Sequence, residues 1–415
     1  MQSTAERLDL LYRISQTFNS SLDLTEVLNR VMDEVIAATR AERGFLMLRE
    51  DDGRLVFRAA RGLDRQTIEA PEFQVSRGLV ERVASEGQPR LTRDAQSDEW
   101  LGPRTSVMNL NLRSVLCAPV KLKDRVLGVI YVDNRLRAGI FTQEDLELLS
   151  AIAASAAVAI ENARLYEVAV DKGRLERELQ VAREVQTTLL PRQMPQLPGW
   201  EFAALWQPAR EVAGDFYDFI YTEAGQLGIV IADVTDKGMP AALFMALARS
   251  TVRASLVNTA SPADGLAHAN RLLCADSANS MFVTLFYAQI EPATGDVVYV
   301  NAGHNPPLLY QAELKQWVKL SRTGMVLGVD EGQQYGQRTL QLQSGDFLFL
   351  YTDGVTEVTN AQVQEFGEAR LQDILSQNCR EEAAVIIKVL AEALRDFRGA
   401  TAPFDDITAV IVKRL

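Results

Sequence analysis

Four short segments in the second half of the chain each place an aspartate beside an apolar run. The segments are EVAGDFYDF with Asp215, LGIVIADVTDKG with Asp233, LFLYTDGVTEV with Asp353, and DDITAVIV with Asp405. A single Asp-Gly after a strand is more often a turn than a ligand. Several half-desolvated aspartates that converge, however, repel one another strongly unless cations neutralise them. The set of four therefore predicts a carboxylate cluster that binds cations.

The other residue types indicate which cation this would be. The sequence has two histidines, His268 and His304, and three widely spaced cysteines, so a zinc site is disfavoured. Mg²⁺ or Mn²⁺ fits carboxylate ligands completed by water. Two such ions about 4 Å apart hold a phosphoryl oxygen and lower the pKa of a bridging water until it becomes a nucleophile. The residues thus indicate phosphoester hydrolysis without a covalent enzyme intermediate.

The elements that must position these residues form the second of two predicted α+β domains. In the first, apolar residues spaced by three and four predict helices at 4–18 and 24–39, the second capped by Asp23. Short strands are predicted at 44–48, 55–59, 114–121 and 126–132, followed by a helix capped by Thr142. Helices on an antiparallel sheet make an α+β domain. After Gly199 the pattern changes to alternating strands and turns.

A heptad-like seam runs through residues 158–190. Alternate steps of three and four from Val158 to Leu189 meet seven apolar residues in ten positions, with Arg and Glu dense between them. We expect a parallel coiled coil that joins two protomers into a homodimer. The alternative is one long helix packed on its own catalytic domain. Pro191, Pro195 and Pro198 end the helix in either case.

The composition excludes several classes of function. The chain has 415 residues, with 43 Lys and Arg against 55 Asp and Glu, a net charge of −12. This length suits two or three globular domains, and such an acidic surface disfavours nucleic acid in the absence of a basic patch. The longest apolar stretch, 148–160, is shorter than the about 20 residues that span a bilayer. We expect a cytoplasmic protein with no membrane span and no nucleic-acid partner.

The first domain resembles a known sensor family. The runs that carry the resemblance are AERGFLMLRE (41–50), SVLCAPVKLKDRVLGVIYVDN (114–134) and FTQEDLELLSAIAASAAVAIENARLYE (141–167). They are similar to a GAF domain, which implies an antiparallel sheet with helices and a role in sensing a small molecule or an upstream signalling protein. The resemblance does not identify the ligand. The predicted organisation is a GAF sensor over 1–165, a coiled-coil linker over 158–190 and a catalytic domain over 191–415.

The catalytic domain resembles the SpoIIE-like branch of the PPM family, the metal-dependent protein phosphatase 2C-like serine/threonine phosphatases. The matching motifs are PAREVAGDFYDF (208–219), ADVTDKGMPAALFMA (232–246), NAGHNPPLL (301–309), LFLYTDGVTEV (348–358) and DDITAVIV (405–412). The resemblance implies a β-sandwich flanked by helices, with a two-metal centre of Mn²⁺ or Mg²⁺ at one end.

The resemblance also implies roles for individual residues. The bridging ligands would be Asp215 and Asp233, with the main-chain carbonyl of Val234 beside them, and Asp353 and Asp405 would complete the other ion's ligands. These four aspartates are the expected catalytic residues.

Residues around these ligands have expected roles as well. Asp218 and Asp406 are expected to support the ligands. Asp236 stands where the family often has glycine, and we favour a solvated turn there over a further ligand. Arg210 either orients phosphate or forms a surface salt bridge, which we favour. Ala213 replaces a glycine, a change that costs little unless the position needs a positive φ.

Together these features predict a signal-regulated protein phosphatase. By family resemblance, its substrate would be a phosphoserine or phosphothreonine on an anti-anti-sigma factor or similar STAS-domain regulator. A signal would shift the coiled coil and reposition the helix at 239–249. The main alternative is a catalytically weak scaffold that binds and sequesters its signalling partner. A two-metal nuclease is disfavoured by the charge.

Overall fold

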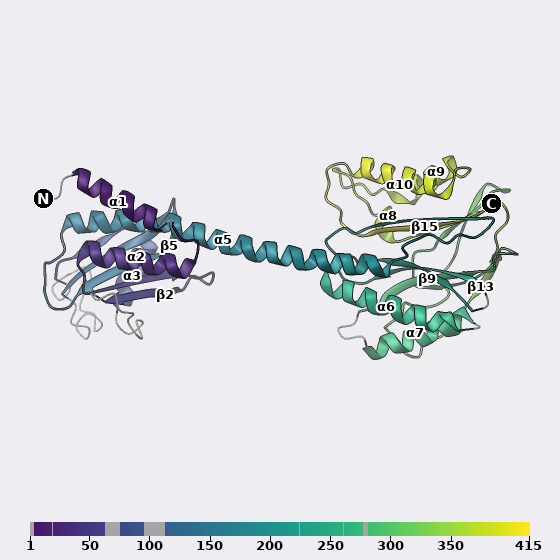
Figure 1. Cartoon of the computed structure of the whole chain (residues 1–415), viewed down its shortest axis with the longest axis horizontal. Coiled ribbons are helices and arrows are strands. Elements are labelled where there is room, and N and C mark those ends of the chain that lie inside the picture. Colours follow the sequence, from purple (N-terminus) through teal and green to yellow (C-terminus); the bar gives the residue numbers. More distant parts are fainter. Residues whose placement is uncertain are drawn as a thin grey trace. The chain divides into compact units, whose positions relative to one another are not determined.

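The structure is a computed structural model that forms two compact units, Met1–Arg174 and Leu175–Leu415 (Figure 1). It describes residues 4–18, 20–62, 75–94, 113–223, 225–259, 261–276 and 281–415. Most of the polar segment expected around 94–104 lies outside these residues. Each unit is described by itself.

The first unit is built on a five-stranded antiparallel sheet in the order β2-β1-β5-β4-β3. A tight turn at Lys123 and Asp124 joins the two strands with the longest pairing. The strands are β1 (Arg43–Arg49), β2 (Leu55–Gly62), β3 (Arg90–Thr92), β4 (Ser114–Leu122) and β5 (Arg125–Asn134). The four predicted strands are present, and β3 is additional.

Helices cover both faces of this sheet. On one face lie α1 (Thr4–Phe18), α2 (Leu24–Thr39) and the first part of α5 (Gln143–Leu189), packed through one apolar core. The other face carries α3 (Arg77–Glu86), a helix that was not predicted from the sequence. The Asp23 side chain accepts the Glu26 N–H, as expected of an N-cap. The α+β architecture of the sensor unit is therefore confirmed.

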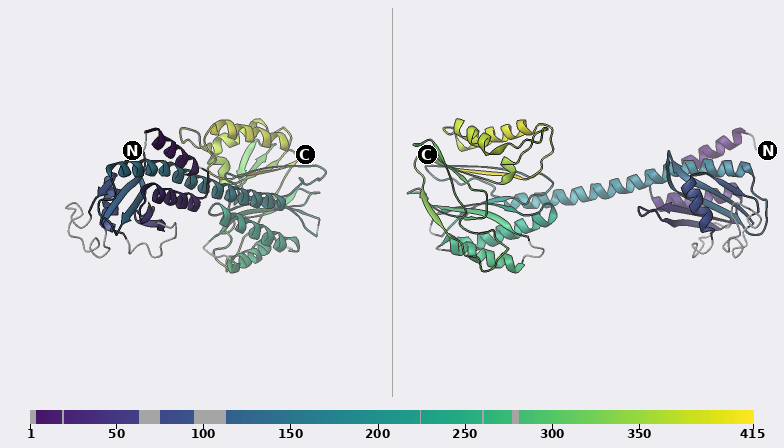
Figure 2. Two further views of the ribbon diagram at one scale, coloured as in Figure 1. Left: turned by 60° about the vertical axis from the view of Figure 1, so that its left-hand side comes forward. Right: turned by 180° about the vertical axis from the view of Figure 1, so that it is seen from behind.

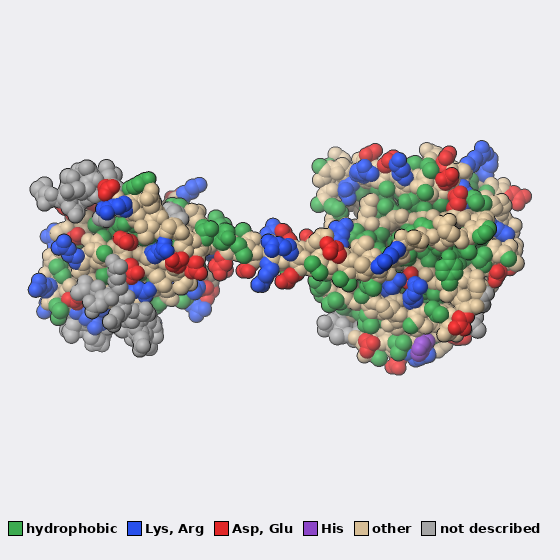
Figure 3. All heavy atoms as spheres, viewed as in Figure 1, with side chains coloured by type: hydrophobic (Ala, Val, Ile, Leu, Met, Phe, Trp, Pro, Cys, Tyr) green, Lys and Arg blue, Asp and Glu red, His purple; other side chains and the backbone are tan. Residues whose placement is uncertain are grey.

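Helix α5 changes character along its length. Thr142 caps its start through bonds exchanged with Asp145, and Ile152, Ala156 and Ile160 are buried against the sheet. Among the described helices it alone is long and apolar enough to cross a membrane, but half of that stretch is buried inside the fold. Beyond it the seam residues Leu165, Val168 and Leu175 are exposed, Val168 at 59%, among charged side chains (Figure 3).

The second unit contains two five-stranded antiparallel sheets. Their orders are β13-β10-β9-β8-β7 and β12-β11-β14-β15-β6. The strands of the first sheet are β7 (Phe216–Tyr221), β8 (Leu227–Val234), β9 (Val283–Ile290), β10 (Asp296–Ala302) and β13 (Arg338–Gln341). Those of the second are β6 (Trp200–Gln207), β11 (Leu308–Gln311), β12 (Gln316–Lys319), β14 (Phe347–Tyr351) and β15 (Ile407–Arg414).

The sheets stack face to face between two layers of helices (Figures 1 and 2). Phe202 of β6 meets Phe219 of β7 edge to face, with ring centroids 5.8 Å apart. Helices α6 (Met239–Val257) and α7 (Pro262–Asp276) cover the first sheet, and α9 (Gly367–Gln377) and α10 (Ala383–Arg398) cover the second. The short α8 (Asp353–Thr356) follows β14. The expected β-sandwich flanked by helices is confirmed.

Candidate metal centre and sensor pocket

The first sheet brings Asp215 and Asp233 together. Strands β7 and β8 are antiparallel neighbours, and Phe216 pairs with Ala232. Asp215 directly precedes Phe216 and Asp233 directly follows Ala232, so the two carboxylates stand side by side at the end of the pair. Most of the other residues in both strands are buried and apolar, which fixes their register.

The second sheet delivers the other two aspartates to the same end of the sandwich. Asp353 opens α8 directly after β14, and Asp405 lies two residues before β15, the neighbour of β14. Between the sheets, the Thr352 hydroxyl donates to Asp215 Oδ2 at 2.7 Å. The four principal aspartates predicted from the sequence thus gather at one site.

Mutual repulsion and burial perturb these carboxyl groups. Burial, followed by the Asp233 charge, raises the pKa of Asp215 well above its usual range. Burial and then the Asp353 charge raise the pKa of Asp233 to about 7. The pKa of Asp353 is raised by burial and by Asp405. Such a cluster ionises fully at neutral pH only when cations compensate its charge.

Asp406 supports the loop that leads to the cluster. Its two carboxylate oxygens accept the N–H groups of Ala209 at 2.7 Å and Gly214 at 2.8 Å. Burial raises the pKa of Asp406, while these hydrogen bonds lower it. The side chain therefore holds the segment before Asp215 against the start of β15.

Asp218 lies on the other side of β7. Successive side chains of a strand point to opposite faces, and Phe219 already faces the second sheet. The Asp218 carboxylate instead pairs with two arginines of α6, Arg249 at 3.0 Å and Arg253 at 2.7 Å. The structure thus uses Asp218 to hold α6 on the sheet and does not bring it into the cluster.

The remaining predicted positions lie around the cluster. Asp236 is exposed in the turn after β8, with φ 75°, and its carboxylate accepts the Lys237 N–H at 2.8 Å. Arg210 is exposed, one residue beyond Ala209. Val234 ends β8, and its carbonyl oxygen lies so close to Gly214 that a Cβ there would approach it to 3.1 Å. Ala213 is buried without a positive φ, so its methyl group is accepted.

Three contributors to the site were not predicted. Lys237 donates to Asp405 Oδ2 at 2.9 Å, and Thr352 links Asp215 to the second sheet. Gln186, assigned to the coiled-coil seam, is buried and bonds the backbone just before Asp215. Thr352 and Lys237 lie within the aspartate segments of the sequence, so the sequence alone showed their residue types and their proximity to the aspartates. Their partners depend on pairing between distant segments.

His304 has a structural position. It is buried, with Nδ1 2.8 Å from the Thr284 hydroxyl and Nε2 3.1 Å from the Tyr351 carbonyl oxygen. Burial lowers the pKa of this imidazole to about 4. The neutral ring bridges β9 and β14, which belong to different sheets.

The donor chemistry of the cluster fits hard divalent cations. All its side-chain donors are oxygens, and the histidine nearby is already hydrogen-bonded on both ring nitrogens. Within the described residues, no group of three or more His, Cys, Asp or Glu side chains already surrounds a single point. Small movements of the carboxylates would therefore accompany cation binding.

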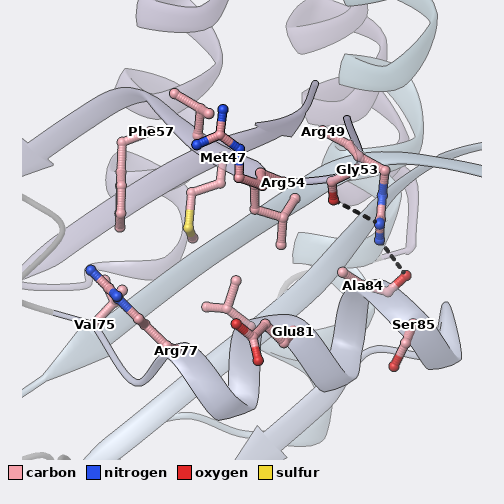
Figure 4. A pocket seen from close by; sticks show the side chains of 13 residues that line it. Met47, Arg49, Gly53, Arg54, Phe57, Val75, Arg77, Glu81, Ala84 and Ser85 are labelled. Atoms are coloured by element: carbon pink, nitrogen blue, oxygen red, sulfur yellow. Dashed lines mark hydrogen bonds between the residues drawn. The ribbon is translucent and has the colours of Figure 1, made fainter. Parts of the chain in front are cut away.

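The sensor unit contains a cavity of about 910 Å³ between the β1–β2 hairpin and α3. Met47 and Phe57 give it an apolar wall, and Arg77 and Glu81 of α3 face them (Figure 4). Arg49 spans the side of the cavity, donating to the carbonyl groups of Gly53 at 3.1 Å and Ala84 at 3.4 Å. The lining suits a small molecule with an apolar body and a charged group.

The fold and the carboxylate cluster define the class of the catalytic unit, the PP2C-type phosphatase sandwich. Residues 223–415 match the family model described as Stage II sporulation protein E (SpoIIE), and residues 21–161 match a GAF domain. The SiaA-PP2C domain of Pseudomonas aeruginosa superposes with a TM-score of 0.54 at 22% identity, covering 60% of this chain and 99% of that domain. This likeness supports the fold.

Curated relatives place the chain within that class. It is 30% identical over 237 residues to the phosphoserine phosphatase RsbU of Bacillus subtilis (strain 168), covering 57% of this chain and 70% of RsbU. It is 31% identical over 265 residues to Protein IcfG of Synechocystis sp., covering 57% of this chain and 41% of IcfG. The chain belongs to the SpoIIE-type family of PP2C-like serine/threonine phosphatases, with a GAF domain before the catalytic unit. These phosphatases are metal-dependent as a family.

Proposed function

We propose that this chain is a signal-regulated phosphatase that removes phosphate from phosphoserine or phosphothreonine on a regulatory protein. The observation that carries the proposal is the convergence of Asp215, Asp233, Asp353 and Asp405 at one end of the sandwich, with raised pKa values at the first three. Carboxylates that repel one another in this way suit divalent cations, which activate water for attack on a phosphoester.

The proposed ligand roles are those that the family resemblance implies, and the positions of the four aspartates support them. Asp215 and Asp233 stand between the two sheets and are suited to bridge two Mn²⁺ or Mg²⁺ ions, with the Val234 carbonyl beside them. Asp353 and Asp405 would hold the ions from the second sheet. When bound, the ions supply an activated water and neutralise phosphoryl charge. Arg210 remains a candidate phosphate contact because its loop is tied to Asp406 through Ala209.

The proposed substrate is a phosphorylated anti-anti-sigma factor or similar STAS-domain protein in the cytoplasm. Its support is the similarity to the phosphoserine phosphatase RsbU, which spans 57% of this chain. The exposed apolar residues of α5 support a homodimer, because Leu165, Val168 and Leu175 are 56–59% exposed at coiled-coil spacing.

The direct test is hydrolysis of p-nitrophenyl phosphate and of a phosphoserine peptide by the full chain. Turnover is expected with Mn²⁺ or Mg²⁺ and is expected to vanish with EDTA, because the carboxylates alone cannot activate water. Turnover that persists in EDTA would contradict the metal mechanism. A chain that binds Mn²⁺ but hydrolyses neither substrate would favour the sequestering scaffold.

Regulation is proposed to act through the end of α5. Gln186 Nε2 donates to the Ala213 carbonyl at 2.9 Å and to the Ala242 carbonyl at 3.4 Å, and Gln186 Oε1 accepts the Ala213 N–H at 3.1 Å. Ala213 lies two residues before Asp215, and Ala242 lies in the first turn of α6. A shift of α5 would therefore move both segments beside the metal centre.

Gln186→Leu is expected to lower turnover severalfold and to destabilise the catalytic unit by about 2 kcal/mol, because it leaves buried backbone groups of Ala213 unpaired. Deleting residues 1–160 is then expected to change the variant's turnover no further. Gln180→Leu, at an exposed position on the same helix, is the matched control. The measurements are turnover and urea unfolding. Wild-type behaviour of Gln186→Leu would show that α5 is not coupled in this way.

A further inference from the structure

A lysine is fixed against the metal-binding carboxylates. Lys237 Nζ donates to Asp405 Oδ2 at 2.9 Å and to the Phe404 carbonyl oxygen at 2.8 Å. The Phe404 ring lies 4.1 Å from the same ammonium group, a cation–π contact, although the residue is 70% exposed. Three contacts thus hold the Lys237 side chain, which comes from the turn after β8 of the first sheet, against the segment that leads into β15 of the second.

These contacts occupy the Asp405 carboxylate. Oδ1 accepts the Asp406 N–H at 3.0 Å, and Oδ2 accepts the Lys237 ammonium. A divalent cation on Oδ2 would lie within a few ångströms of that ammonium, where like charges repel.

We propose that Lys237 is a positioning residue that competes with the divalent cation for Asp405 and so sets the affinity of the metal centre. This inference rests on the proposed function, because it concerns the same site. The ammonium group orients Asp405 through Oδ2, and it must withdraw from that oxygen for the carboxylate to bind a metal ion fully.

The position of Lys237 in the chain connects this competition for Asp405 to the proposed regulation through α5. The residue lies in the turn between β8 and α6, directly before Gly238, the N-cap of α6. Gln186 of α5 bonds the Ala242 carbonyl in the first turn of the same helix. Displacing the start of α6 therefore moves the ammonium relative to Asp405, so the position of α5 and the metal affinity are linked through one ion pair.

The test is calorimetric titration of the full chain with Mn²⁺. Lys237→Met is expected to bind Mn²⁺ about tenfold more tightly, because a unit positive charge a few ångströms from the ion is removed at a partly screened site. Lys237→Arg, which keeps the charge, is expected to stay within about twofold of the wild type. Lys388→Met, at an exposed position of α10, is the control for loss of a distant lysine.

The half-saturating Mn²⁺ concentration for turnover is expected to fall with the dissociation constant in Lys237→Met. Unchanged or weaker Mn²⁺ binding by Lys237→Met, with Mn²⁺ bound by the wild type, would overturn the inference and leave the metal centre standing. Failure of every variant and of the wild type to bind Mn²⁺ would overturn the proposed function as well.

Discussion

Asp233→Asn is expected to abolish phosphatase turnover and, with EDTA present, to make the folded chain more stable at pH 8. The loss of turnover follows from the position of Asp233 between the two sheets, where it is proposed to bridge both ions. Removing a bridging carboxylate is expected to lower turnover roughly 1,000-fold, because metal ions contribute several kcal/mol to transition-state stabilisation.

The gain in stability follows from the sign of the pKa shift. Asp233 has a pKa of about 7 in the folded chain, against an ordinary value of 3.8. At a pH between these two pKa values, the Asp233 carboxyl group is ionised in the unfolded chain but protonated in the folded chain. The free energy of unfolding therefore falls as the pH rises, and this loss is complete above pH 7. Asparagine carries no such charge. We expect the variant to gain on the order of 2 kcal/mol at pH 8 and nothing near pH 4.

Two measurements check this pair of effects. Turnover is measured with Mn²⁺ and p-nitrophenyl phosphate, and the free energy of unfolding is measured by urea titration in EDTA at both pH values. Asp236→Asn is the matched control, because this neighbouring aspartate is exposed in the turn, and it should keep both turnover and stability. Retained turnover in Asp233→Asn, or lower stability at pH 8, would contradict the expected role.

Gly354→Ala is expected to damage the site through the backbone. A Cβ at this position would lie 1.9 Å from the Asp406 carbonyl oxygen and 3.4 Å from the Asp405 Cβ. The start of β15 must therefore move away from α8, which carries Asp353. We expect a loss of about 2–3 kcal/mol in unfolding free energy, typical of overpacking, and a fall in turnover of at least about 100-fold.

Gly173→Ala provides the comparison for this substitution. Gly173 lies within α5, and a methyl group added there would have no neighbour within 4 Å, so alanine should raise helix stability by about 0.5–1 kcal/mol and leave turnover unchanged. Circular dichroism and turnover below the unfolding transition separate a displaced site from an unfolded chain. Full activity in Gly354→Ala would show that β15 tolerates the movement.

Much of the architecture was accessible from sequence because its signals are local. Spacings of three and four predicted the helices at 4–18 and 24–39 with their observed bounds, and Asp23 caps the second. The four principal aspartates follow or open apolar strands, a pattern that predicted a carboxylate cluster, whereas the β-sandwich was expected from the family resemblance. Helix α3 was not predicted, because the helical spacing of its apolar residues was not recognised in the sequence.

The details that escaped prediction depend on contacts between distant segments. Asp218 sits among apolar residues like Asp215, yet the alternation of β7 turns it toward Arg249 and Arg253, which lie on α6. Gln186 fits the heptad spacing, but its amide pairs with Ala213, 27 residues later. The side of a strand and the partner of a polar side chain are fixed by the packed neighbour, which single-sequence patterns do not specify.

The order of strands in the second sheet has a consequence for how the catalytic unit is made. β15 is the last strand in sequence, yet it lies between β14 and β6 and pairs with β6, which begins at Trp200. During synthesis, about 200 residues must be added after β6 before β15, its neighbour in the sheet, has been made. The pairing of these two strands therefore has a high contact order. Asp405 lies two residues before that same strand, so a nascent chain that lacks β15 has neither the complete five-stranded sheet nor all four aspartates. Catalysis is thereby tied to completion of the fold.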